Sequence, residues 1–159
     1  MDQQTIFVKM AMTAWDGYHK RTEALFNSLS DEEMQREVAP GKNTALYLYG
    51  HLIAVHDSMI PLLGFGDKLY PGHEEVFIKN PDKASKEKPS IETLRQHWNK
   101  VHFALKNYFD KMSPAQWFER HNSISEEDFI LEPYRNKLSV LMSRTSHMAW
   151  HYGQVLLAK

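Results

Sequence analysis

The sequence of 159 residues contains no cysteine. This absence excludes disulfide bonds, thiolate metal ligands and a cysteine nucleophile, although an external thiol could still take part in a reaction. No apolar run reaches the roughly 18 residues of a membrane-spanning helix. The N-terminus, Met1 to Gln4, also lacks the basic start and apolar stretch of a signal peptide. We therefore expect a cytoplasmic protein that does not associate with membranes.

An excess of charge of either sign is also missing, since 19 basic residues face 20 acidic ones. The chain as a whole therefore has no positive field that would attract a nucleic acid, and we expect no nucleic-acid partner. Hydrophobic residues make up 42% of the chain and charged residues 25%, as in ordinary globular proteins. The length fits one domain, which we place at residues 1–159.

Four long segments have the periodicity of amphipathic helices, and no segment has the alternation of a strand. They cover about residues 5–29, 43–63, 90–112 and 136–158. In the first, the expected buried face contains Phe7, Ala11, Ala14, Tyr18, Leu25 and Leu29. The third has the clearest stripe, with steps of three and four through Ile91, Leu94, Trp98, Val101, Leu105, Tyr108 and Met112.

The helix boundaries also have recognisable signals. Ser30 followed by Glu33 predicts a capping box and a short helix, and Ser90 predicts the cap of the third long helix. Asn43 or Thr44 can cap the second helix. We expect residues 67–89 to form a long loop with at most one short helix, and residues 118–133 to be irregular.

These segments predict an all-α four-helix bundle with a long connection after the second helix. The alternative is a three-helix bundle with an independent fourth helix, which would leave one apolar face in water. The four tryptophans, Trp15, Trp98, Trp117 and Trp150, are more large aromatic residues than one small core easily buries. We therefore also expect a homodimer.

Nine histidines are many for this length, and two of them stand at a spacing that suits a metal ion. His147 and His151 lie one turn apart on a helix face, so both rings can reach one ion at about 2.1 Å. The metalloprotease motif H-E-x-x-H has the same spacing, but Met148 replaces its glutamate and excludes that reading. The alternative is a pair of hydrogen-bonded, partly buried histidines.

A third ligand has to come from a facing helix, where the second segment offers His51 and His56. These residues are about 140° apart around the helix axis, so only one can face the ion. His51 lies on the apolar side after Gly50, whereas His56 precedes Asp57 and is expected at the flank of the bundle. We predict that His51 is the ligand, against the alternative of a hydrogen-bonded core histidine.

Three residues close in sequence to His147 and His151 could contribute to the site. Arg144 precedes His147 by three residues and could hold an anion or form a salt bridge. Gln154 could orient a ligand imidazole or lie at the surface, and Gly153 would suit the close approach of another helix. For the remaining histidines we expect solvated or hydrogen-bonded structural roles: His19, His73, His97, His102 and His121.

Two distant motifs resemble the DinB/YfiT family: Asn43-Thr44-Ala45 followed by Gly50-His51-Leu52, and His147-x-x-x-His151-x-Gly153-Gln154. The resemblance implies a four-helix bundle in which His51, His147 and His151 bind a divalent metal, commonly zinc or nickel. The family usually has an arginine where this chain has Tyr152. Any role of that arginine in anchoring a substrate or partner therefore does not carry over.

The resemblance also implies two functions. Some relatives use such a site for transfer or isomerisation reactions with low-molecular-weight thiols. The chain would then be a metal-dependent enzyme, a thiol-dependent transferase or a hydrolase, acting on a small molecule. The alternative is a non-catalytic, stress-associated binding or scaffold bundle whose metal is structural or vestigial.

Overall fold

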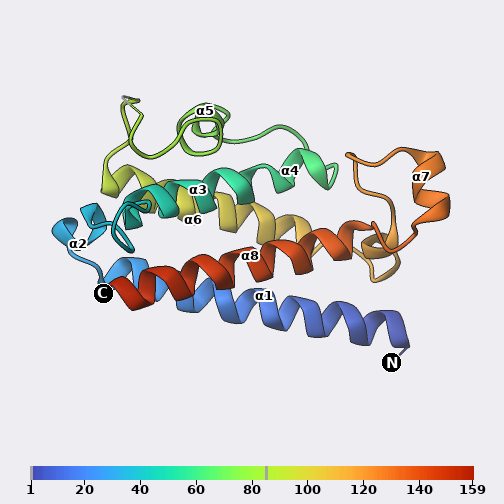
Figure 1. Ribbon diagram of the computed structural model, residues 1–159. Helices are drawn as coiled ribbons and strands as arrows, with labels where there is room; N and C mark the ends of the chain where they lie inside the picture. Colours follow the sequence, from blue (N-terminus) through green and yellow to red (C-terminus); the bar gives the residue numbers. More distant parts are fainter. Residues whose placement is uncertain (1, 85) are drawn as a thin grey trace.

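The computed structural model describes residues 2–84 and 86–159. Its four long helices are α1 (Gln3–Ser28), α3 (Ala45–Asp57), α6 (Ile91–Phe109) and α8 (Lys137–Ala158), which pack side by side as a bundle (Figure 1). The described residues contain no β-sheet. The predicted all-α four-helix bundle is confirmed.

The direction of the helices explains the long connection after the second one. In Figure 1, α1 and α8 run toward the same end of the bundle, whereas α3 and α6 both run toward the other. Because α3 and α6 are neighbours that point the same way, the chain has to travel back along the bundle between them. Residues 63–90, which we call the crossover, make this return and contain the short helix α5 (Gly72–Phe77).

Two buried carboxylates fasten the crossover to the bundle. Asp57, at the end of α3, accepts hydrogen bonds from the backbone N–H groups of Leu69 and Tyr70, both at 2.8 Å. Asp82 accepts one from the Thr44 N–H at 2.6 Å and pairs with Lys88 at 2.8 Å. These contacts hold both ends of the crossover, so α5 lies against α3.

The capping signals in the sequence correspond to real helix starts. Ser30 and Glu33 form the predicted capping box of α2 (Asp31–Gln35), and the Ser90 hydroxyl accepts from the Thr93 N–H at 3.1 Å. Of the two candidates for the cap of α3, Thr44 is the one used, since its hydroxyl accepts from the Tyr47 N–H.

Two expectations about the helices were wrong. The second helix breaks at Ser58 into α3 and a single turn, α4 (Met59–Leu62), because Pro61 has no N–H to donate to the carbonyl of residue 57. Residues 118–133 are not irregular throughout, since Ser125 caps the helix α7 (Glu126–Leu131). A 3-10 turn, Ala115–Phe118, precedes it.

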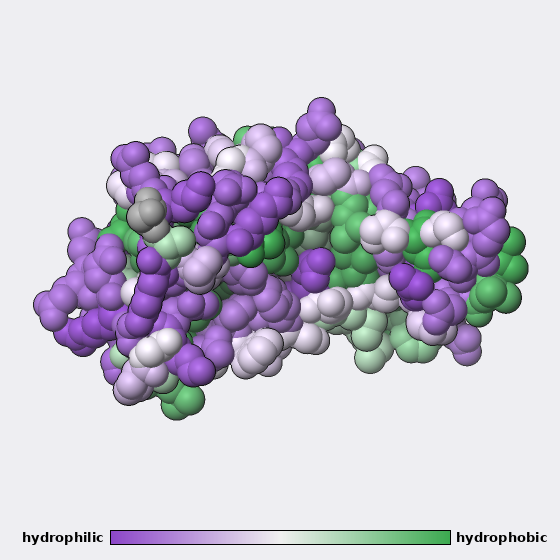
Figure 2. All heavy atoms as spheres, turned by 45° about the horizontal axis from the view of Figure 1, so that its top comes forward, coloured by the Kyte–Doolittle hydropathy of each residue, from purple (hydrophilic) through white to green (hydrophobic). Residues whose placement is uncertain are grey.

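Helix α7 escaped prediction because it buries none of its residues and therefore has no amphipathic pattern. Ile130 and Leu131 are 74% and 79% exposed. Figure 2 shows hydrophobic atoms at the right-hand end of the molecule, where α7 lies, whereas the crossover side is largely hydrophilic.

The core confirms the stripe of α6 and part of the predicted face of α1, where Leu25 and Leu29 are buried and Ala11 and Tyr18 pack against the core. Leu94, Trp98, Val101 and Leu105 are all fully buried. In α1, Phe7 and Ala14 are exposed instead of buried. The rotation of α1 is set by Trp15, whose ring contacts His56, His102 and Phe109 of the neighbouring helices, so that Thr22 and Phe26 follow it into the core. Among the described residues, no helix has the length and apolar character needed to cross a membrane.

Gly50 allows the crossover to approach α3. A Cβ atom at this position would overlap the Phe77 ring of α5, which is itself fully buried. We expect Gly50→Ala to push Phe77 outward and to lower the free energy of unfolding by about 1–3 kcal/mol, the usual cost of overpacking. Chemical denaturation measures this loss. Gly153→Ala, where a Cβ would meet nothing within 4 Å, is the matched control and should not destabilise the protein.

Candidate metal centre

Three histidines from two helices meet at one point in the bundle. His51 lies on α3, and His147 and His151 lie one turn apart on α8. The Nε2 atom of His147 is 3.2 Å from that of His51 and 3.0 Å from that of His151. All three ligand atoms lie within 4.8 Å of one another, so this group can hold a metal ion.

The opposite ring nitrogens of two of these histidines have hydrogen-bond acceptors. His51 Nδ1 donates to the Phe77 carbonyl at 2.9 Å, and His151 Nδ1 donates to the Gln154 side-chain oxygen at 2.7 Å. Both acceptors require the proton on Nδ1, so the neutral rings turn unprotonated Nε2 atoms toward His147. Metal-binding histidines in proteins usually have such a partner, which fixes the tautomer and the orientation of the ring.

The spacing of the nitrogens fits a shared ion. Two nitrogens that each lie 2.1 Å from a tetrahedral ion are about 3.4 Å apart. The observed separations of 3.2 and 3.0 Å are close to that value. Without a cation, at least two lone pairs point at the same place, and the buried Nδ1 atom of His147 has no hydrogen-bond partner among the described residues. The donor set therefore suits a divalent metal.

Burial keeps the three rings in the form that binds metal. The pKa of His147 is lowered from 6.5 to about 4, mainly by desolvation and also by the neighbouring imidazoles of His151 and His51. Burial is also the largest cause that lowers the pKa of His51 and of His151. The imidazoles are therefore neutral at pH 7, as ligands must be.

One side of the centre opens to a pocket of about 550 Å³. His151 itself lines this pocket, together with Trp150 and Gln154 of α8 and Leu48 of α3. The Trp150 ring is 66% exposed and stacks on His151 with 5.6 Å between ring centroids. A small molecule in this pocket would therefore touch one of the three candidate ligands.

The structure places His51 with the pair on α8, as the sequence predicted, but the expectation for His56 was wrong. His56 is fully buried instead of lying at the flank, and its Nδ1 is 3.0 Å from His102 Nε2. The signal was present in the sequence, since His56 follows the buried Tyr49 and Leu52 at helical spacing.

The other predictions near the site had mixed outcomes. The hydrogen bond between His151 and Gln154 confirms the first of the two alternatives for Gln154, that it orients an imidazole of the group. Gly153 does not serve a close approach, because a Cβ there would have open space around it. His73 belongs to α5, not to a loop, and is paired with His97 at 2.8 Å. The Phe77 carbonyl was missed, because no sequence pattern identifies a backbone acceptor.

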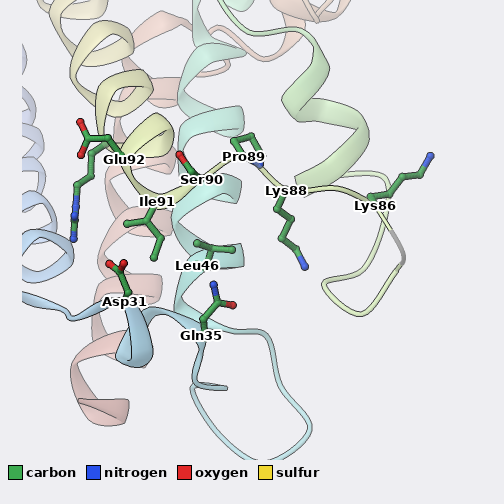
Figure 3. Close-up of a pocket in the computed structure, with 10 residues that line it drawn as sticks. Asp31, Gln35, Leu46, Lys86, Lys88, Pro89, Ser90, Ile91 and Glu92 are labelled. Atoms are coloured by element: carbon green, nitrogen blue, oxygen red, sulfur yellow. The ribbon is translucent and has the colours of Figure 1, made fainter.

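Another hollow, of about 720 Å³, is lined by none of the three histidines. Figure 3 shows Asp31 and Gln35 of α2 on one side of it and Ile91 and Glu92 of α6 on the other. Its cations are already engaged, since Arg95 donates to the Leu29 carbonyl and Lys88 pairs with Asp82. The chemistry of the histidine group therefore does not extend into this hollow.

The contact between His151 and Gln154 gives a testable prediction. Replacing Gln154 with alanine removes the acceptor that orients His151 and should weaken metal binding by about 10–100-fold. Gln154→Glu keeps an acceptor at the same position and should retain the affinity. A competition titration with a metal chelator measures both variants. Equal losses in the two would contradict an orienting role for this side chain.

Comparisons with known proteins bear on the family and the fold. A family model described as the DinB superfamily matches residues 14–155. A crystal structure of a conserved protein from Enterococcus faecalis superposes with a TM-score of 0.65 over 99% of this chain and 95% of that one, at 18% identity. At this identity the likeness shows the fold alone. No curated protein gave a significant match.

Proposed function

Since the chain belongs to the DinB superfamily, whose model covers residues 14–155, we propose that it is a metal-dependent enzyme with a centre at His51, His147 and His151. The reaction we propose is transfer of a group to a low-molecular-weight thiol, or hydrolysis, on a small-molecule substrate. The observation that carries the proposal is the convergence of three Nε2 atoms beside an accessible pocket. Zinc or nickel is the ion we propose.

Different residues of the chain have different roles in the proposed reaction. The Phe77 carbonyl and the Gln154 amide hold two of the imidazoles in the tautomer that leaves Nε2 free. Bound there, a divalent ion would lower the pKa of a thiol or a water molecule beside it. The pocket lined by Trp150 and Leu48 gives a substrate apolar contacts next to that position.

The composition of the group favours an enzyme over a purely structural metal. A structural zinc site usually has four protein ligands, whereas a catalytic site keeps one position open. Among the described residues, the group contains the three histidines and no fourth histidine or carboxylate. This observation supports the enzyme against the alternative of a scaffold with a structural or vestigial metal.

A spectroscopic experiment tests the open position. The untagged protein is loaded with Co²⁺, and a low-molecular-weight thiol such as cysteine is added. We expect a thiolate-to-cobalt charge-transfer band in the wild-type protein, because an open position accepts the thiol. If Co²⁺ binds but no thiol concentration changes the spectrum, the thiol-dependent function is wrong. Metal analysis of untagged protein from cells identifies the native ion.

We also propose that the protein is a homodimer, although the tryptophans no longer support it. Trp15, Trp98 and Trp117 are buried in the monomer. The surface that favours pairing is instead on α1, where Ile6, Phe7 and Met10 are 44%, 56% and 64% exposed. Light scattering should give twice the monomer mass of 18.6 kDa, and Phe7→Lys should reduce it. A wild-type monomer at micromolar concentration would contradict the proposal.

A further inference from the structure

Arg144 differs from the other arginines because it has no partner among the residues that the structure describes. The others contact a carboxylate, a carbonyl or an aromatic ring. Arg144 makes no hydrogen bond or salt bridge with any described residue, and its buried Nε atom is without an acceptor. Desolvation is the one cause that shifts its pKa, which is lowered. An unpaired, half-buried guanidinium is costly unless it binds something else.

The guanidinium borders a cavity of about 260 Å³ between α4, the segment before α7 and the first half of α8. No aspartate or glutamate lines this cavity. Its other cation, Arg135, is paired with Glu132 at 2.9 Å, so Arg144 carries the charge that is not neutralised. The cavity is therefore electropositive.

Two further polar groups of the cavity are suited to donate hydrogen bonds. His121 Nδ1 accepts from the Ser123 N–H at 3.3 Å, so a neutral ring carries its proton on Nε2. The Ser143 hydroxyl lines the same cavity one residue before Arg144. A guanidinium group with neighbouring N–H and O–H donors is the arrangement that binds carboxylate and phosphate oxygens.

The cavity and the histidine centre are neighbours on α8. Arg144 precedes His147 by three residues, a rise of about 4.5 Å along the helix, so the two side chains lie on one face. An anion held by Arg144 would therefore lie about one helical turn from His147.

We propose that Arg144 anchors an oxyanion group of the substrate, so that the substrate is a small organic anion with a carboxylate or phosphoryl group. This assignment rests on the proposed function, since it names the substrate class of the same centre. The anion binds in the cavity between α4 and α8, one helical turn along α8 from His147. The neutral histidine ligands leave the charge of a bound metal uncompensated, which favours an anionic ligand further.

Calorimetric titration of the metal-free, untagged protein with inorganic phosphate and, separately, with acetate tests the anchor without the metal. We expect saturable binding of at least one of them, which also separates phosphoryl from carboxylate recognition. Arg144→Gln should weaken it at least tenfold, and Arg144→Lys should weaken it less. Arg135→Gln, which removes the cation already paired with Glu132, is the control and should change it little.

Two results would overturn the proposal: wild-type protein that binds neither anion at millimolar concentration, or Arg144→Gln protein that binds as tightly as wild type. Thermal melting shows that each variant is folded, and Arg144→Gln should not be less stable than wild type, because it removes an unpaired charge. Metal content is measured separately. A protein that binds anions through Arg144 but no metal would refute the proposed function and leave the anchor intact.

Discussion

Alanine at any one of His51, His147 and His151 is expected to abolish stoichiometric metal binding. Loss of an orienting partner costs about 10–100-fold in affinity, and loss of a ligand should exceed that range. Each of the three supplies one nitrogen to the same group, and the described residues provide no replacement within it. Elemental analysis of untagged protein, combined with a chelator competition, measures the effect.

The best control for these variants is His97→Ala. His97 is partly exposed, pairs with His73 and does not belong to the three-histidine group, so its loss should leave the metal content at the wild-type value. His56 is not a ligand either, but its full burial means that His56→Ala also disturbs the core. Wild-type metal content in His51→Ala or His151→Ala would show that the site is wrongly assigned. The metal-free protein should stay folded, because the large cluster of buried apolar side chains does not depend on the ion.

Acid is expected to destabilise the protein steeply below pH 6.5, because the fold buries neutral histidines. Burial lowers the pKa of His56 and of His102 well below 6.5, and it lowers the pKa of His73 to about 4. As the pH falls below 6.5, the unfolded chain takes up protons that the folded chain does not. Stability is therefore complete above 6.5 and decreases from there toward the lower folded-state pKa values.

Each histidine that stays neutral in the folded state adds up to about 1.4 kcal/mol per pH unit to this slope. Urea denaturation of the metal-free protein between pH 7.5 and 5 should therefore show a slope that His56→Gln reduces by up to that amount. The slope tests the idea whatever the overall stability of the variant is. An unchanged slope in His56→Gln, or a wild-type stability that is flat over this range, would contradict it.

Most of the fold could be predicted from local sequence signals. The caps at Ser30, Thr44 and Ser90 depend on residues three positions apart, and the stripe of α6 repeats within one helix. Such patterns need no knowledge of the rest of the chain. Helix α7 lacks them, because its apolar residues face solvent. Two positions of the α1 face, Phe7 and Ala14, were wrong because the rotation of α1 depends on what Trp15 contacts in α3 and α6.

The candidate site was predictable in part for the same reason. The pair His147 and His151 is a local spacing, and Gln154 follows it by three residues. The choice of His51 over His56 depended on the apolar character of one helix face. The Phe77 carbonyl is 26 residues from His51 and became its partner only because the crossover folds back over α3. No local pattern reports such a contact.

The position of this carbonyl links the candidate centre to local unfolding. The group combines α3, α8 and the crossover, so lifting α5 from α3 removes the acceptor of His51 and frees its ring to turn. An ion bound to the three histidines would favour the closed form by mass action. The amide protons of α5 should then exchange with solvent more slowly when the centre is loaded than when it is empty. Hydrogen exchange at a segment that supplies no metal ligand would thus report on the occupancy of the centre.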